Sequence, residues 1–121
     1  MTERSEPLVA VVCAVPILGE ALSAALEGLA ECKVIPARQP ELGGLLKSLQ
    51  PDAIVVDDEQ EAAVAATYAR FARTPVINVS LRDQRVTRLD DGKWEEPDEN
   101  DISPETIRNL VAGGIYGRRA H

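Results

Sequence analysis

The sequence predicts an α/β domain in which a parallel sheet lies between two layers of helices. Along residues 8–80, short uninterrupted aliphatic runs alternate with amphipathic segments of about a dozen residues, a pattern typical of right-handed βαβ crossovers. The chain has 121 residues, which suits a single domain over residues 1–121. Apolar residues make up 45% of it and aromatic residues only 3%, and this aliphatic mixture favours helix-on-sheet packing over a β-sandwich.

The first half of the chain contains three predicted strands and two predicted helices. Residues 8–13 form an unbroken aliphatic run, as expected for a strand that is covered on both faces. Residues 17–30 carry apolar side chains with the spacing of an amphipathic helix. Residues 32–36 predict a second strand and 53–56 a third. Pro40 opens a second helix between them, weakened by the adjacent glycines at 43 and 44.

A third helix is predicted over residues 61–73, and a fourth strand follows at 76–79. On that helix Val64, Tyr68 and Phe71 recur at helical spacing, which indicates a buried face.

After residue 80 the alternation stops, and the dipeptide Asp91-Gly92 predicts a β-hairpin over residues 85–96. With this turn Asp90 faces Lys93, Leu89 faces Trp94 and Arg88 faces Glu95. Two of these pairs carry opposite charges and the third is aliphatic–aromatic, so the register is self-consistent. The hairpin takes the place of a last regular βα unit.

The last predicted element is a helix over residues 103–114. Ser103 is expected to be its N-cap and Pro104 its first residue. Gly113 and Gly114 are expected to end it.

Charge is concentrated in one segment. The net charge is −7, and residues 90–101 hold seven of the twenty acids and one base, Lys93. Without a basic stripe, binding to a nucleic-acid backbone is not expected. Arg82, Arg85 and Arg88 are expected to pair with the acidic segment instead. No apolar run is long enough for a membrane span and the N-terminus does not resemble a signal peptide, so we expect a cytoplasmic protein that does not bind membranes.

Cys13 and Cys32 are the two cysteines, and we expect both to be free thiols because they fall near opposite ends of neighbouring strands. Neither their spacing nor the single histidine, His121, matches a metal site, so no metal is predicted. A nucleophilic role for Cys13 would need a phosphate-binding loop. The loop after it is apolar and contains Pro16, which has no N–H, so a buried structural cysteine is the favoured interpretation.

Three segments within residues 8–80 resemble response-regulator receiver domains. Pro16-Ile17-Leu18-Gly19-Glu20 is similar to the start of the first receiver helix, Pro51–Asp57 to the third strand, and Pro75–Ser80 to the fourth. The resemblance implies a flavodoxin/CheY-like fold with strand order 2-1-3-4. It also implies that Asp57 stands at the phospho-acceptor position and Ser80 at the switch hydroxyl.

Two features that receivers require are absent. The first-strand turn carries Cys13, Ala14 and Val15 in place of an acidic pair, and no lysine ends a fifth parallel strand. An aspartyl phosphate needs Mg²⁺, which in turn needs several oxygen ligands. A second interpretation of Asp57 is therefore a strand-end carboxylate that caps the next helix.

These observations predict a stand-alone pseudo-receiver that regulates or signals through protein–protein contact, without catalysis and without a cofactor. Its partner would be another protein, a second copy of the chain, or both. Trp94, Arg88 and Glu95 are the interface candidates.

Two alternatives stay open. One is a response regulator of a phosphorelay that is weakly phosphorylated on Asp57. The other is a ligand-binding domain or thiol-dependent enzyme that uses the crevice at the strand carboxyl ends. That crevice would be lined by residues 13–16, 57–59 and 80–82.

Overall fold

The computed structural model describes residues 6–90 and 92–119. Within these residues the protein is an α/β domain with a six-stranded mixed sheet and four helices, and the strand order is β2-β1-β3-β4-β5-β6. The strands are β1 (Leu8–Cys13), β2 (Glu31–Pro36), β3 (Ala53–Val56), β4 (Val76–Ser80), β5 (Arg85–Asp90) and β6 (Lys93–Glu95). The helices are α1 (Pro16–Ala25), α2 (Leu42–Leu49), α3 (Glu59–Ala72) and α4 (Pro104–Arg119).

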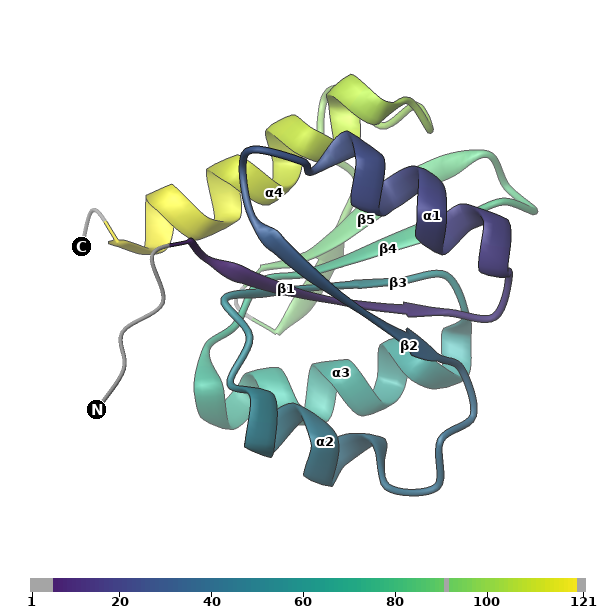
Figure 1. Cartoon of the computed structure of the whole chain (residues 1–121). Coiled ribbons are helices and arrows are strands. Elements are labelled where there is room, and N and C mark those ends of the chain that lie inside the picture. The colour runs from purple at the N-terminus through teal and green to yellow at the C-terminus, as the bar shows by residue number, and fades with distance from the viewer. Residues whose placement is uncertain (1–5, 91, 120–121) are drawn as a thin grey trace.

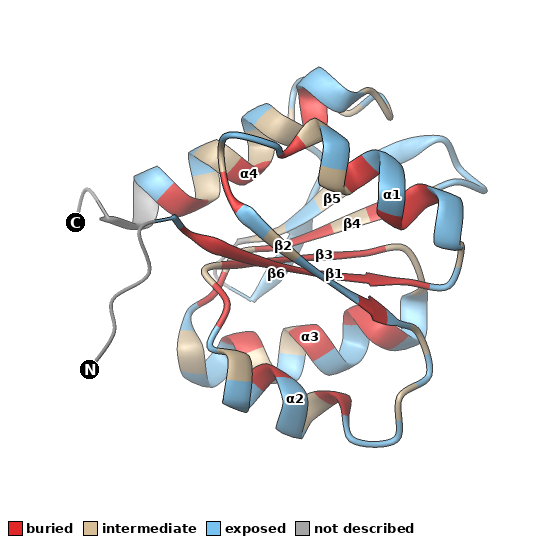
Figure 2. Cartoon of the chain, viewed as in Figure 1, coloured by how far each residue is buried: buried red, intermediate tan, exposed pale blue. Residues whose placement is uncertain are grey.

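The sheet lies between two helical layers, as predicted. Helices α1 and α4 cover one face, and α2 and α3 cover the other (Figure 1). Alternate residues of the central strands therefore enter two separate apolar clusters: Val9, Val11 and Val55 pack under α1 and α4, whereas Ala10 and Ile54 pack under α2 and α3. Figure 2 shows β1 and β3 as the most continuously buried strands, which explains why their sequences are unbroken aliphatic runs.

The first four strands are parallel in the predicted order, and the hairpin joins their edge. Strand β5 pairs antiparallel with β4, with Val76 opposite Leu89 and Ser80 opposite Arg85. Strand β6 then pairs with β5 in the predicted register, including Leu89 opposite Trp94. The predicted parallel sheet with a C-terminal hairpin is thus one six-stranded mixed sheet, because the turn at 81–84 returns the chain directly along β4.

The predicted buried face of α3 was wrong. Alanines at 62, 65 and 69 face the sheet together with Glu61, while Phe71 is 85% exposed and Val64 lies near the surface. Of the predicted residues only Tyr68 packs partly against the cluster under α2 and α3. Small side chains allow the helix to lie close to the sheet, whereas Val64 and Phe71 are turned outward. Helix α1 is also shorter than predicted, because the chain leaves it through a turn after Ala25.

The predicted end of the last helix at the two glycines was also wrong, since α4 continues to Arg119. The reason lies in packing: a Cβ on Gly114 would come within 2.9 Å of the Pro75 side chain, whereas one on Gly113 would meet nothing within 4 Å. Gly114 therefore allows a close approach of helix and chain rather than a helix stop. The Ser103 cap is confirmed, because its hydroxyl accepts a hydrogen bond from the N–H of Thr106 at 3.1 Å.

Helix α4 is tied to α1 by Arg108, which donates hydrogen bonds to the backbone carbonyls of Ala25 and Glu27, each at 2.9 Å. These carbonyls end α1 and the turn after it, where a cation also complements the helix dipole. No helix in residues 6–90 and 92–119 has the length and apolar character needed to cross a membrane.

Candidate functional site

Both carboxylate oxygens of Asp57 accept hydrogen bonds from backbone N–H groups. Asp57 follows β3 and reaches across to the loop after β1, where one oxygen accepts a hydrogen bond from the Ala14 N–H at 2.8 Å. The other oxygen accepts one from the Val15 N–H at 3.2 Å. Hydrogen bonds from N–H groups to a charged acceptor are among the stronger ones in proteins. The side chain that resembles a phospho-acceptor thus joins the ends of β3 and β1.

This arrangement also serves the start of α1. Val15 is the N-cap residue of that helix and offers no capping side chain, and Pro16 follows at its first position. Asp57 places a negative group next to this N-terminus, where the helix dipole favours it. The interpretation that Asp57 caps the following helix is therefore wrong: Asp58 is the N-cap of α3 and accepts a hydrogen bond from the Gln60 N–H at 2.8 Å.

A second acid fixes the neighbouring loop, and sequence reasoning missed it. Glu61 is only 4% exposed, and its carboxylate accepts a hydrogen bond from the Arg38 N–H at 2.9 Å. Arg38 has a positive φ of 66°, so this contact holds a backbone conformation that non-glycine residues rarely adopt. The available signal was the helical wheel: Glu61 lies beside the alanines of the core-facing stripe, where an acid needs a partner.

Asp57, Asp58 and Glu61 thus each accept a hydrogen bond that positions a different backbone segment. Among the residues that the structure describes, no group of three or more His, Cys, Asp or Glu side chains comes together in a way that could hold a metal ion. The positions next to Asp57 across the sheet are Ala14 and Val15, and they contribute N–H donors rather than oxygen ligands.

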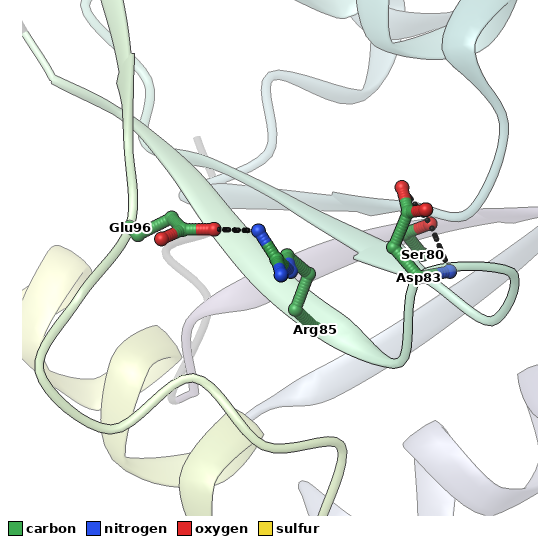
Figure 3. A network of polar contacts seen from close by, with 4 residues as sticks. All are labelled: Ser80, Asp83, Arg85 and Glu96. Atoms are coloured by element: carbon green, nitrogen blue, oxygen red, sulfur yellow. Dashed lines mark hydrogen bonds and ion pairs between the residues drawn. The ribbon is translucent and has the colours of Figure 1, made fainter.

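Ser80 is engaged in the turn after β4 and not with Asp57. Its hydroxyl donates to the Asp83 carboxylate and accepts from the Asp83 N–H, both at 3.2 Å (Figure 3). A Ser hydroxyl that bonds to a backbone group a few residues further along the chain is a recurrent feature of turns. The contacts of Ser80 thus fix the turn that starts the antiparallel part of the sheet.

Cys13 lies at the end of β1 and is 5% exposed. Burial, followed by the nearby charge of Asp57, raises the pKa of its thiol to about 12. Near neutral pH the sulfur is therefore protonated and a poor nucleophile. Burial also raises the pKa of Cys32, and both cysteines are free thiols, as predicted.

The structure contains a pocket of about 830 Å³, which coincides only in part with the expected strand-end crevice. It lies over β1 and β2 beside α1, and Glu20 and Arg38 are its charged residues. Of the expected lining, only residues 13, 14 and 16 take part, and the segments 57–59 and 80–82 do not contribute. The complete lining is Cys13, Ala14, Pro16, Glu20, Ser23, Val34, Pro36, Ala37 and Arg38.

The three interface candidates lie together on the hairpin. Trp94 is 41% exposed and lies opposite Leu89, which packs partly against the cluster under α2 and α3. Cross-strand neighbours share a face, so Trp94 extends this apolar surface beyond α3. Arg88 and Glu95 are opposite one another on the other face of the hairpin.

Of the arginines expected to pair with the acidic segment, Arg85 is seen to do so. Arg85 forms an ion pair with Glu96, in which both side chains are about half exposed (Figure 3). Such an exposed pair adds little to stability. Acidic side chains at residues 95, 96, 98 and 99 are exposed in the segment that contains Trp94.

Comparisons with known proteins do not assign the chain: no family model, no curated protein and no solved structure matches it.

Proposed function

We propose that this protein is a non-catalytic interaction module, with the receiver-like, flavodoxin-like arrangement in its first four strands and a hairpin that contacts a protein partner. The single observation that carries the proposal is the double hydrogen bond of Asp57 to Ala14 and Val15. Phosphorylation of this carboxylate would have to break its hydrogen bonds to two backbone N–H groups, which disfavours the reaction. Among the described residues, no group of three or more His, Cys, Asp or Glu side chains is available there to help hold the magnesium that the transfer needs.

The hairpin supports the interaction half of the proposal. Trp94 is a partly exposed aromatic residue surrounded by acids, and tryptophan is enriched among residues that dominate binding energy. The acids 95, 96, 98 and 99 around it favour a partner with basic side chains. The segment also replaces a regular βα unit, so the sheet extends beyond α3 at this edge.

The first experiment tests the absence of phosphorylation. We expect incubation with acetyl phosphate and Mg²⁺ to give no phosphorylated species by intact-mass spectrometry, with Asp57→Asn as the matched control. Efficient labelling of the wild type that is lost in the variant would establish the alternative, a weakly phosphorylated response regulator that uses Asp57.

The second experiment tests the hairpin surface. In a pull-down, a partner protein that binds the wild type should no longer bind the Trp94→Ala variant. It should still bind the Phe71→Ala variant, which truncates another exposed aromatic residue, on α3. If both variants lose partner binding equally, the contact is not specific to the hairpin. If both retain it, Trp94 is not part of the interface.

A second candidate function, small-ligand binding, is favoured by the pocket beside α1. Its thiol-dependent form is disfavoured, because the raised pKa of Cys13 keeps the thiol protonated. Rapid alkylation of Cys13 by iodoacetamide near pH 7, measured in a Cys32→Ala background, would support the thiol enzyme. Slow alkylation would rule out the thiol enzyme and leave non-covalent ligand binding as the remaining form of this candidate function.

A further inference from the structure

The edge of the sheet opposite the hairpin is formed by β2. Among the described strands it is bonded to β1 alone, so its other side has no neighbour. This edge has six residues, twice as many as β6 at the opposite edge. Long open edges are the usual site of strand addition.

The hydrogen-bond pattern tells which backbone groups are directed outward. The N–H of Glu31 donates to the carbonyl of Pro7 at 2.8 Å, and the N–H of Ala37 donates to the carbonyl of Cys13 at 3.1 Å. Backbone groups alternate in direction along a strand, so odd-numbered residues face β1. The N–H and C=O groups of Cys32 and Val34 therefore point away from the sheet.

The side chains alternate in the same way. Ile35 is buried under α2 and α3, and the exposed Glu31 and Lys33 lie on its side of the sheet. Cys32 packs partly against the cluster under α1, and Val34 on the same side is 44% exposed. An open edge thus carries one acid and one base, two residues apart, on one face and an uncovered valine on the other.

We propose that β2 pairs antiparallel with β2 of a second copy of this chain, around a two-fold axis that passes through Cys32. In this register Glu31 of each copy lies opposite Lys33 of the other, which gives two opposite-charge pairs. Cys32 of each copy exchanges N–H and C=O hydrogen bonds with its counterpart. The pairing is isologous and closed, so it ends at a dimer.

The neighbouring registers are less favourable for identifiable reasons. An axis through Lys33 would place the two lysines opposite each other, where like charges destabilise a sheet. An axis through Val34 would set Pro36, which has no N–H, opposite Cys32 and lose a hydrogen bond on each side. Charge and backbone chemistry therefore select the same register.

The dimer would form one continuous sheet through both copies and leave each hairpin at an outer end. The turn before β2 of the second copy would lie along the exposed Val34 and the margin of the pocket beside α1. The proposal does not depend on the function of the hairpin. If the hairpin does bind a partner, the dimer presents two such surfaces, which increases avidity.

Charge reversal gives the sharpest test, measured as the dimer dissociation constant by sedimentation equilibrium. We expect Lys33→Glu to weaken the dimer by about tenfold or more, because both cross-strand pairs become repulsive. Glu31→Lys should have a similar effect, and the double exchange Glu31→Lys/Lys33→Glu should restore dimerisation. Circular dichroism would verify that every variant is folded.

Lys33 and Pro36 are also residues that protect a free edge from pairing, and the same measurements decide between the two roles. A wild type that stays monomeric at high micromolar concentration, or a double exchange that fails to restore a weakened dimer, would overturn the proposal.

Cysteine cross-linking provides an independent reading of the register. Opposite residues that exchange hydrogen bonds have Cα atoms about 5.5 Å apart, within the range that a disulfide can bridge. Mild oxidation with copper phenanthroline should give a covalent dimer in the wild type and in Cys13→Ala, but not in Cys32→Ala or Lys33→Glu. Trp94→Ala should cross-link as the wild type does, because the hairpin lies at the opposite edge of the sheet. A wild type that forms no dimer linked through Cys32 would overturn the proposed register.

Discussion

The regular part of the domain, residues 8–80, and the hairpin part that follows it use their acids in opposite ways. In the regular part Asp52, Asp57 and Glu61 each accept a hydrogen bond from the backbone of a distant segment. In the hairpin part Glu95 and Glu96 lie on the surface. The role of a carboxylate at a strand end therefore cannot be assigned until its hydrogen-bond partners are known.

Backbone geometry explains the difference. The parallel strands end in crossover loops whose N–H groups find no neighbour in the sheet, so carboxylates from β3 and α3 satisfy them. In the hairpin, the backbone groups of β5 and β6 bond to each other. The acidic side chains there are left to solvent and to nearby arginines.

The largest expected effect concerns the close contact between α4 and the chain before β4. Gly114→Ala should lower the free energy of unfolding by about 1–3 kcal/mol, because the new Cβ would overlap the side chain of Pro75. Gly113→Ala should raise it by about 0.5–1 kcal/mol, because alanine is the better helix former and the space around it is open. Urea denaturation followed by circular dichroism measures both, and equal effects would refute the close approach.

The second prediction tests the two uses of acids directly. Asp57→Ala should cost about 1–2 kcal/mol, because two N–H groups lose their acceptor and water replaces it only in part. Asp57→Asn should cost less, since the amide oxygen still accepts one hydrogen bond. Glu99→Gln, in the exposed loop that follows the hairpin, should change the free energy of unfolding by no more than about 0.5 kcal/mol. A Glu99 effect as large as that of Asp57→Ala would remove the distinction between the two parts.

The third prediction concerns pH. The folded state keeps the Cys13 thiol protonated up to a pKa of about 12, whereas the unfolded chain loses this proton near the ordinary value of 9.0. The unfolded state therefore binds fewer protons between these values, and stability must fall as pH rises through that range. Cys13→Ala should flatten this fall, as measured by the urea midpoint at a series of pH values. A fall of unchanged steepness would show that other groups cause it.

The smallest expected effect lies in the hairpin. A double-mutant cycle of Arg88→Ala and Glu95→Ala should give a coupling of about 0.2–1 kcal/mol in unfolding free energy, which salt should reduce. The pair is exposed, so larger couplings are not expected. A coupling near zero at low salt would show that the register places these residues opposite without an interaction between them.

Much of the fold could be predicted from the sequence because it follows from local patterns. The alternation of aliphatic runs and helices indicates the parallel strands, and Asp91-Gly92 indicates the hairpin and its register. The length of α4 and the inward face of α3 could not be predicted, because they depend on contacts distant in sequence. Gly114 meets Pro75, and three alanines allow α3 to approach the sheet.

The candidate site was less predictable for the same reason. A strand that ends in Asp57 is compatible with a phospho-acceptor or a structural carboxylate, and its hydrogen bonds to Ala14 and Val15 depend on contacts that the sequence does not reveal. The bond from Arg38 to Glu61 joins residues 23 positions apart and leaves no motif. The pocket beside α1 depends on the packing of a helix against an edge strand.

Because only residues 81–84 separate β4 from β5, the last three strands form a meander whose pairings are local in sequence, whereas β1 to β4 are joined through helices. Local pairings close with little loss of chain entropy, so the meander can form and open quickly. Its outermost strand, β6, has three residues and no further neighbour in the described sheet. Amide hydrogens there should exchange with solvent through local opening, long before those of β1 and β3.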